Sequence, residues 1–274
     1  MWIKWIGIIG ILIAVSLGIA TIYGKYRWQS DTDKLRAKLI NGQRTIKPKI
    51  YDQTEIEGLP TVIKDGQAIA SAVKLSQQGL FNLSETEDKW SPFTATQFVT
   101  TQRPGFDWDA RIQMAPGVNA FVHDTYLLGE GSLHASLLGL FTVANMHGAP
   151  ENNQGELLRF LAETPWYPTA LLPSQGVRWE AINDTSARAT LTDGATTVSV
   201  VFQFNAEGAI ATMRAEARYR DKLTAMPWCG RFGEYSVRNG MLIPLEGEVG
   251  WEYPEGIRLY FKGRITEIEY EFAS

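Results

Sequence analysis

The sequence predicts a mainly β fold of the α+β class, in which an N-terminal transmembrane helix precedes a curved antiparallel sheet or half-barrel with one or two covering helices. Residues 5–24 form an uncharged, mostly apolar run, the length that a helix needs to cross a bilayer. From residue 79 onward, short segments alternate apolar and polar residues between turn-forming residues, which is typical of strands. Strand following strand across short turns favours an antiparallel sheet over an alternating βαβ chain.

The N-terminal apolar run is expected to be an uncleaved membrane anchor. The aromatic residues that flank it, as rings at both headgroup layers would, are Trp2, Trp5, Tyr23, Tyr26 and Trp28. A cleaved secretory signal would need a shorter apolar core with small residues behind it, whereas bulky residues follow this run. A buried globular helix is disfavoured because no polar face marks the run. We therefore expect a single-pass membrane protein.

Composition predicts one folded domain behind this anchor. The chain contains 45% hydrophobic and 20% charged residues, which is typical of a globular protein with a sizeable core. We assign residues 1–28 to the anchor, 29–57 to a juxtamembrane linker and 58–274 to a single β-rich domain. The polar, basic linker is either a solvated tether or a segment in contact with anionic headgroups, and the sequence leaves both open.

The domain is expected to consist of a series of strands. A short helix is expected within residues 61–75, ahead of the first strand. The clearest hairpin surrounds Asp193 and Gly194, because an Asp-Gly pair supplies the positive φ angles of tight turns. Residues 133–143 are mostly apolar, so periodicity leaves them open between strand and helix. Strands are predicted at residues 79–83, 94–100, 106–112, 118–129, 188–191, 197–204, 209–219, 231–237, 241–244, 246–253 and 257–272.

A single helix is expected in the middle of these strands, at residues 152–164. Leu157, Leu158 and Leu161 lie on one stripe of this helix, and Pro165 ends the pattern. The segment that follows, residues 166–173, is too rich in proline for a regular strand or a long helix.

Charge and motif content exclude several function classes. The net charge of -4 provides no basic field for phosphates, so no nucleic-acid partner is expected. Cys229 is the only cysteine and cannot form an internal disulfide. His123, His134 and His147 lack the close spacing of zinc motifs, so no metal is expected. No cofactor is expected either, because the sequence has no P-loop, dinucleotide or G-x-S-x-G signature.

The predicted helix carries the strongest candidates for catalysis. Glu156, Arg159 and Glu163 recur at positions i, i+3 and i+7, so a helix places them on one face opposite its leucines. Arg231 is a candidate partner for this face if the helix lies across an open sheet. A solvated or ion-paired surface is the alternative explanation of the three residues.

Two aspartates in one predicted strand are a second candidate. Asp107 and Asp109 flank Trp108, so strand alternation places both carboxylates on one face of the sheet. A glycosidase-like pair of carboxylates is one interpretation. A charged outer face with Trp108 in the core is the other, and alternation alone favours it.

The aromatic residues favour binding over catalysis. Trp166, Tyr167 and Trp228 occur in irregular, proline-marked segments, where binding groups concentrate. We expect these three residues, together with Leu157 and Leu161, near the mouth or lid of a site for an apolar ligand. Core packing is the alternative explanation for aromatic residues of this kind.

The segment around the predicted helix also carries a family resemblance. Residues 155–163 (GELLRFLAE) and 166–173 (WYPTALLP) resemble the core of an uncharacterised bacterial family, a domain of unknown function. Further parts that resemble it are residues 90–95, 104–110, 227–231, 243–244 and Trp251. The resemblance spans residues 58–272 and implies one domain without an established activity. More distantly, the order of strands, helix and strands is similar to LolA-type lipoprotein carriers, whose curved half-barrel sheets cover an apolar cavity with helices.

The leading hypothesis is a noncatalytic, membrane-anchored domain that holds an apolar or lipid-like molecule in a concave antiparallel sheet. A hydrolase-like enzyme that uses the charged helix face, and a structural module of an envelope complex, are the alternatives. Basic residues after the apolar run favour a cytoplasmic domain, whereas the carrier-like analogy favours an outer one. We expect the domain to lie outside the cytoplasm.

Overall fold

The structure is a computed structural model that describes residues 2–43, 55, 69–84 and 86–272. Within this part of the chain, thirteen strands form one open antiparallel sheet, in the order β6-β5-β4-β3-β2-β1-β13-β12-β11-β10-β9-β8-β7. Six of the strands are β1 (Ala70–Asn82), β2 (Trp90–Thr100), β3 (Gly105–Ala115), β4 (Val118–Leu127), β5 (Glu130–Leu137) and β6 (Phe141–His147). The others are β7 (Arg178–Asn183), β8 (Ser186–Asp193), β9 (Thr196–Phe204), β10 (Ile210–Tyr219), β11 (Ala225–Arg238), β12 (Met241–Tyr253) and β13 (Gly256–Phe272).

The sheet consists of two wings that meet at its centre. Strands that follow one another in the sequence are neighbours, except for β6 and β7, which lie at the two edges of the sheet, and β1 pairs with β13 at its centre. The first wing therefore runs from β1 to β6 and the second from β7 to β13. The predicted mainly β fold is confirmed as one large, open antiparallel sheet, and the described residues add two α-helices to it.

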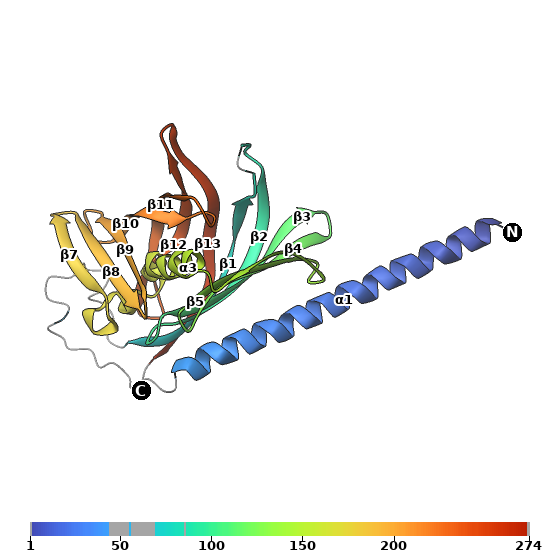
Figure 1. Cartoon of the computed structure of the whole chain (residues 1–274), viewed down its shortest axis with the longest axis horizontal. Coiled ribbons are helices and arrows are strands. Elements are labelled where there is room, and N and C mark those ends of the chain that lie inside the picture. Colours follow the sequence, from blue (N-terminus) through green and yellow to red (C-terminus); the bar gives the residue numbers. More distant parts are fainter. Residues whose placement is uncertain (1, 44–54, 56–68, 85, 273–274) are drawn as a thin grey trace.

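The two α-helices lie on opposite faces of the sheet (Figure 1). Helix α1 (Trp2–Gln43) contacts β2, β3 and β4 on the outer face, whereas α3 (Pro150–Ala162) lies within the curve of the sheet and contacts strands of both wings. Strand β3 shows the division of side chains between the faces. Trp108 belongs to the core on the inner face, as predicted, and Asp107 and Asp109 face outward toward α1. The charged outer face is therefore as expected, but Asp107 and Asp109 are buried there because α1 covers them, which the sequence did not predict.

Between the two wings, α3 is followed by three short 3-10 helices: η2 (Thr164–Trp166), η3 (Pro168–Leu171) and η4 (Pro173–Gln175). A proline stands in the first turn of each, where its missing N–H costs nothing, and each proline prevents the chain from continuing as a longer helix. Hydrogen bonds fix this segment to the second wing: Trp166 Nε1 donates to Pro244 O at 3.1 Å and Tyr270 Oη donates to Trp166 O at 2.8 Å.

Helix α1 continues without a break across the boundary predicted at residue 28. Its second half packs on the sheet, and its first half extends away from the domain (Figure 1). At the point of departure, a Cβ atom on Gly24 would overlap the carbonyl of Leu138, so only glycine permits this close approach. Within the residues that the structure describes, no helix is long and apolar enough to cross a membrane. The side chains at positions 7, 10, 13 and 14 of the apolar run lie outside that description.

The structure adds to the sequence predictions in three places. In the range 61–75, where a short helix is expected ahead of the first strand, residues 70–75 are strand, because β1 begins at Ala70, and residues 61–68 lie outside the described part, so the short helix stays a prediction. The open segment 133–143 contains strands, since β5 ends and β6 begins there around a turn with positive φ at Leu138 and Gly139. Strand β7 was not predicted, because this short edge strand is largely exposed and lacks clear alternation.

Candidate functional site

The inner face of the sheet and α3 together border a cavity of about 980 Å³. Both wings contribute to its wall. The apolar and aromatic residues that line it include Phe81, Trp90, Trp108, Ile112, Val122, Trp166, Met213, Trp228, Phe232, Val249, Trp251 and Phe261. A cavity of this size with such a lining is typical of sites for small apolar molecules.

Helix α3 divides its side chains between the core and this cavity. Leu157, Leu158 and Leu161 are fully buried in the core, as their common stripe predicts. Glu156, Arg159, Glu163 and Ala162 line the cavity. The predicted charged face therefore exists, but it faces the cavity on the inner side of the sheet instead of the solvent. Of the two explanations offered for these charged residues, ion pairing is the one that the structure shows, and the ion pairs are buried.

Arg159 is the centre of the first buried ion-pair network. Its Nε lies 2.7 Å from Glu163 Oε1, its Nη1 contacts Asp124 of β4, and its guanidinium lies 4.9 Å from the ring centre of Trp108. Gln97 Nε2 donates to Glu163 Oε2 at 2.6 Å. Burial alone would lower the pKa of Arg159, but the charges of Glu163 and Asp124 raise it above its ordinary value. Arg159 therefore stays charged and ties α3 to the first wing.

Arg218 of β10 forms the corresponding contacts on the second wing. Its Nη2 lies 3.2 Å from Glu156 Oε1, and its Nε donates to Gly155 O at 3.2 Å. Its Nη1 donates to Tyr260 Oη at 3.3 Å, and Trp228 Nε1 donates to the same oxygen at 2.9 Å. The two arginines thus attach α3 to opposite wings of the sheet, and their ion pairs form part of the cavity wall.

Two carboxyl groups, those of Glu156 and Asp124, lie close together in this wall. Glu156 Oε2 and Asp124 Oδ1 are buried, and neither accepts a hydrogen bond from any N–H or O–H group of the described residues. Burial, and then the charge of Asp124, raise the pKa of Glu156 well above its ordinary value, although Arg218 and Arg159 oppose the shift. Two adjacent carboxylates cannot readily both ionise in a buried site. Burial and the charge of Asp124 therefore favour the protonated form of Glu156.

Replacing Glu156 by glutamine is expected to make the protein more stable at neutral pH and to change its pH dependence. As pH rises above the ordinary pKa of a glutamate, the unfolded chain loses the Glu156 proton and the folded chain keeps it, so the free energy of unfolding falls with pH until the raised pKa is passed. Glutamine has nearly the same shape as glutamate and does not titrate. We expect a gain of about 1 kcal/mol at pH 7 and none near pH 4. Urea unfolding followed across this pH range tests it, and parallel pH profiles of the two proteins would contradict it.

The structure brings some of the predicted site residues together and separates others. Trp166 and Trp228 line the cavity. Leu157, Leu161 and Tyr167 are completely buried in the core and do not line it, because the leucine stripe of α3 packs on the sheet. Tyr167 Oη donates to the carbonyl of Phe160 at 2.7 Å. Arg231 also lies away from the cavity, on an exposed surface where its Nη2 pairs with Glu248 Oε2 at 2.5 Å.

Sequence reasoning missed four polar residues of the site: Asp124, Arg218, Tyr260 and Gln97. Their partners lie 35 to 66 residues away in the sequence, so no local spacing connects them. One signal was present. His123 and Asp124 are neighbours in the predicted strand 118–129, so they face opposite sides of the sheet, and a charged residue on the apolar face of a sheet needs a buried partner.

A second buried polar cluster attaches α1 to the outer face. Trp28 Nε1 donates to Asp109 Oδ1 at 2.7 Å, and Arg36 Nε pairs with Asp107 Oδ2 at 2.9 Å. Thr32 Oγ1 lies 3.1 Å from His123 Nε2, and His123 Nδ1 lies 2.7 Å from Asp107 Oδ1. This order resembles a nucleophile, base and orienting acid, but all three groups are buried beneath α1, and none lines the cavity. Their role is to hold the helix, and we call these six residues the α1 clip.

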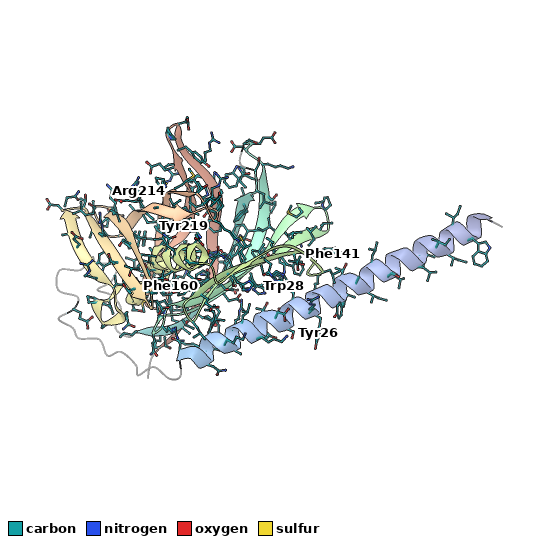
Figure 2. The ribbon with its side chains drawn as sticks, in the orientation of Figure 1. Tyr26, Trp28, Phe141, Phe160, Arg214 and Tyr219 are labelled. Carbon is teal, nitrogen blue, oxygen red and sulfur yellow. The ribbon has the colours of Figure 1, made fainter. Side chains whose placement is uncertain are left out.

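Trp28 differs from the role that its position suggests. It was expected to be an aromatic belt residue at the membrane surface, yet it is buried and stacks on His123 with ring centres 4.5 Å apart. Figure 2 shows Trp28 turned toward the sheet and Tyr26 turned away from it. The belt assignment is therefore wrong for Trp28, because the sheet supplies an acceptor and a stacking partner for its indole.

Comparison with known proteins gives a family and a fold. No curated protein is recognisably similar to this chain in sequence. A crystal structure of a LolA superfamily protein from Nitrosomonas europaea is similar over 82% of this chain and 96% of that protein, with 9% identity and a TM-score of 0.42. A likeness at this level says nothing about function. The resemblance to a family of unknown function is confirmed: the chain belongs to the family DUF6920, whose profile matches residues 59–270.

Proposed function

We propose that the domain binds an apolar or lipid-like molecule in the cavity between the sheet and α3. The observation that carries this proposal is the cavity itself, about 980 Å³ in volume and walled by aromatic and aliphatic side chains from both wings. A sheet that curved only to form a packed core would fill this space with its own side chains. Burial of an acyl chain in such a space is favourable in proportion to the apolar area removed from water.

The charged groups of the wall support a structural role in place of catalysis. Arg159 and Glu163 pair with each other, and Arg218 pairs with Glu156. The remaining oxygens of Glu156 and Asp124 are shielded from solvent. These groups hold α3 in place over the sheet, where it forms one wall of the binding site.

A hydrolase-like enzyme remains the second candidate, because one observation favours it. Glu156, Arg159 and Glu163 do converge on the cavity wall, and the raised pKa of Glu156 favours the protonated form that a general acid needs. Release of nitrophenol from p-nitrophenyl esters tests this candidate. Turnover that is lost in Glu163→Gln while the folded state is retained would favour the enzyme; absence of turnover in the unaltered protein would leave the binding role.

We also propose that residues 5–24 anchor the protein in a membrane, with the domain outside the cytoplasm. The support is the apolar sequence of this run and the exposed side chains along the first half of α1, which include Ile6, Ile11, Leu12, Leu17, Ile19 and Ile22. Contiguous exposed apolar surface of this kind marks contact with a membrane or another protein. Resistance of the full chain to alkaline extraction tests the anchor, and protease digestion of intact and lysed cells tests the side.

Photolabelling of the full chain in its membrane tests the binding site. A palmitic acid that carries a diazirine is expected to attach to cavity strands such as β12 and β13. Val249→Trp adds bulk to the cavity wall and should reduce this labelling, because the larger ring occupies the space of the ligand. Val237→Trp is the matched control, because Val237 is 63% exposed and does not line the cavity. Labelling that avoids the cavity, or that is equal in the two variants, would contradict the proposal.

A further inference from the structure

One end of the first wing carries exposed apolar side chains at three neighbouring hairpin ends. They are Leu83 after β1, Met114 near the end of β3 and Phe141 at the start of β6, with exposed fractions of 49%, 48% and 67%. We call these three residues the apolar rim. Large apolar side chains that project into water from a hairpin tip are unfavourably hydrated, and no packing contact offsets this cost.

Strand pairing places these three residues at the same end of the sheet. Asn82 pairs with Trp90, and Phe93 pairs with Ile112, two residues before Met114. The turn that follows β3 lies beside the turn that precedes Phe141, because Leu138 N donates to Asn119 O at 3.0 Å. The rim therefore lies at one end of the strands of the first wing.

Helix α1 leaves the domain at this same end. Gly24 lies against the carbonyl of Leu138 and the side chain of Leu140, in the turn that leads into Phe141. Figure 2 shows Phe141 beside the part of α1 that leaves the sheet. The apolar run of α1 ends at Gly24, and the helix continues into the clip without interruption. No flexible spacer separates the apolar run from the rim.

From this geometry we infer that the apolar rim docks on the surface of the lipid bilayer that holds α1, so that the cavity opens toward the membrane. Helix α1 is continuous, and the buried α1 clip fixes it to the sheet. The position of its apolar run therefore sets the position of the domain. If residues 5–24 occupy the hydrocarbon core, Gly24 lies at its boundary and the rim lies in the headgroup layer. Tyr23 and Tyr26 are exposed at the same level, which suits that layer.

One residue of the rim also lines the cavity. Leu83 and Ser84, which follow β1, line the cavity together with Trp90 at the start of β2. A docked rim therefore brings this part of the cavity wall to the bilayer surface. A lipid can then pass from the membrane into the cavity without crossing bulk water, which deepens the proposed function and rests on its membrane anchor.

Depth measurements on the full chain in phosphatidylcholine and phosphatidylglycerol vesicles test the inference. Cys229 is first replaced by serine, and single cysteines are placed at Leu17, Met114, Phe141 and Leu128 for labelling with the fluorophore NBD. Leu128 is the matched control, because it is 46% exposed but lies at the opposite end of the wing, after β4. We expect NBD at positions 17, 114 and 141 to emit at shorter wavelengths than NBD at position 128. Iodide is expected to quench NBD at position 128 but not at the other three positions.

Two other results would overturn the inference, and they are distinguishable. If position 17 is protected while positions 114 and 141 behave like 128, the anchor is inserted and the rim does not dock. If position 17 is also accessible to iodide, the membrane anchor fails, and the inference fails with it. Photolabelling of the cavity by palmitic acid is read separately, so lipid binding is judged independently of both.

Discussion

Replacing Arg159 by methionine is expected to lower the free energy of unfolding by about 3–5 kcal/mol, because it removes one partner from a buried charge network. Arg159 pairs with Glu163 at 2.7 Å and also contacts Asp124. Methionine preserves the aliphatic packing near Trp108 but leaves the Asp124 carboxylate beside Glu156 without its cation. Asp124 must then remain charged in a buried site or take up a proton, and either outcome destabilises the attachment of α3 to the first wing.

Arg231→Met is the matched control for this prediction. Arg231 also pairs with a glutamate, Glu248, but its side chain is 66% exposed. Ion pairs at this exposure contribute about 0–1 kcal/mol. Urea unfolding of the full chain measures both variants under identical conditions. Equal losses in the two variants would show that the Arg159 network is not a buried determinant of the fold.

Replacing Trp28 by alanine is expected to cost about 3–5 kcal/mol, the usual range for truncating a large buried aromatic side chain. The indole is 2% exposed, stacks on His123 and donates to Asp109. Its loss removes apolar packing, leaves a cavity under α1 and takes a donor from a buried carboxylate. The second half of α1 should then detach from the sheet before the sheet itself unfolds.

Limited proteolysis and urea unfolding together measure the Trp28 variant. Trypsin is expected to cut within the second half of α1, which carries Arg27, Lys34 and Arg36, much faster in Trp28→Ala than in the unaltered chain. Tyr26→Ala is the matched control, because Tyr26 is 76% exposed and its truncation should change stability by about 0.5 kcal/mol or less. Unchanged protection of α1 in Trp28→Ala would contradict the clip.

The sequence predicted the elements of this fold better than their contacts. Alternation and turn residues are local signals, and they placed most strands, the 152–164 helix and the inward direction of Trp108. Burial of Asp107 and Asp109 was not predictable from alternation, because it depends on α1, whose contacting residues lie 71 to 81 positions earlier. A strand pattern identifies two faces but does not say which of them another element will cover.

The candidate site was predictable only in part for the same reason. Helical spacing grouped Glu156, Arg159 and Glu163 on one face, and the structure keeps them together on the cavity wall. Their partners Asp124 and Arg218 come from different wings, so the ion pairs depend on how the sheet curves. The curvature of the sheet depends on all thirteen of the described strands, so no local sequence pattern predicts it.

Native mass spectrometry of the full chain, released from its membrane in mild detergent, tests the central claim most directly. The account predicts that the unaltered chain and Val237→Trp retain a lipid-sized adduct, whereas Val249→Trp loses it because the tryptophan occupies the cavity. A chain that carries no adduct in any of the three forms, or the same adduct in all of them, would contradict an apolar binding site between the sheet and α3.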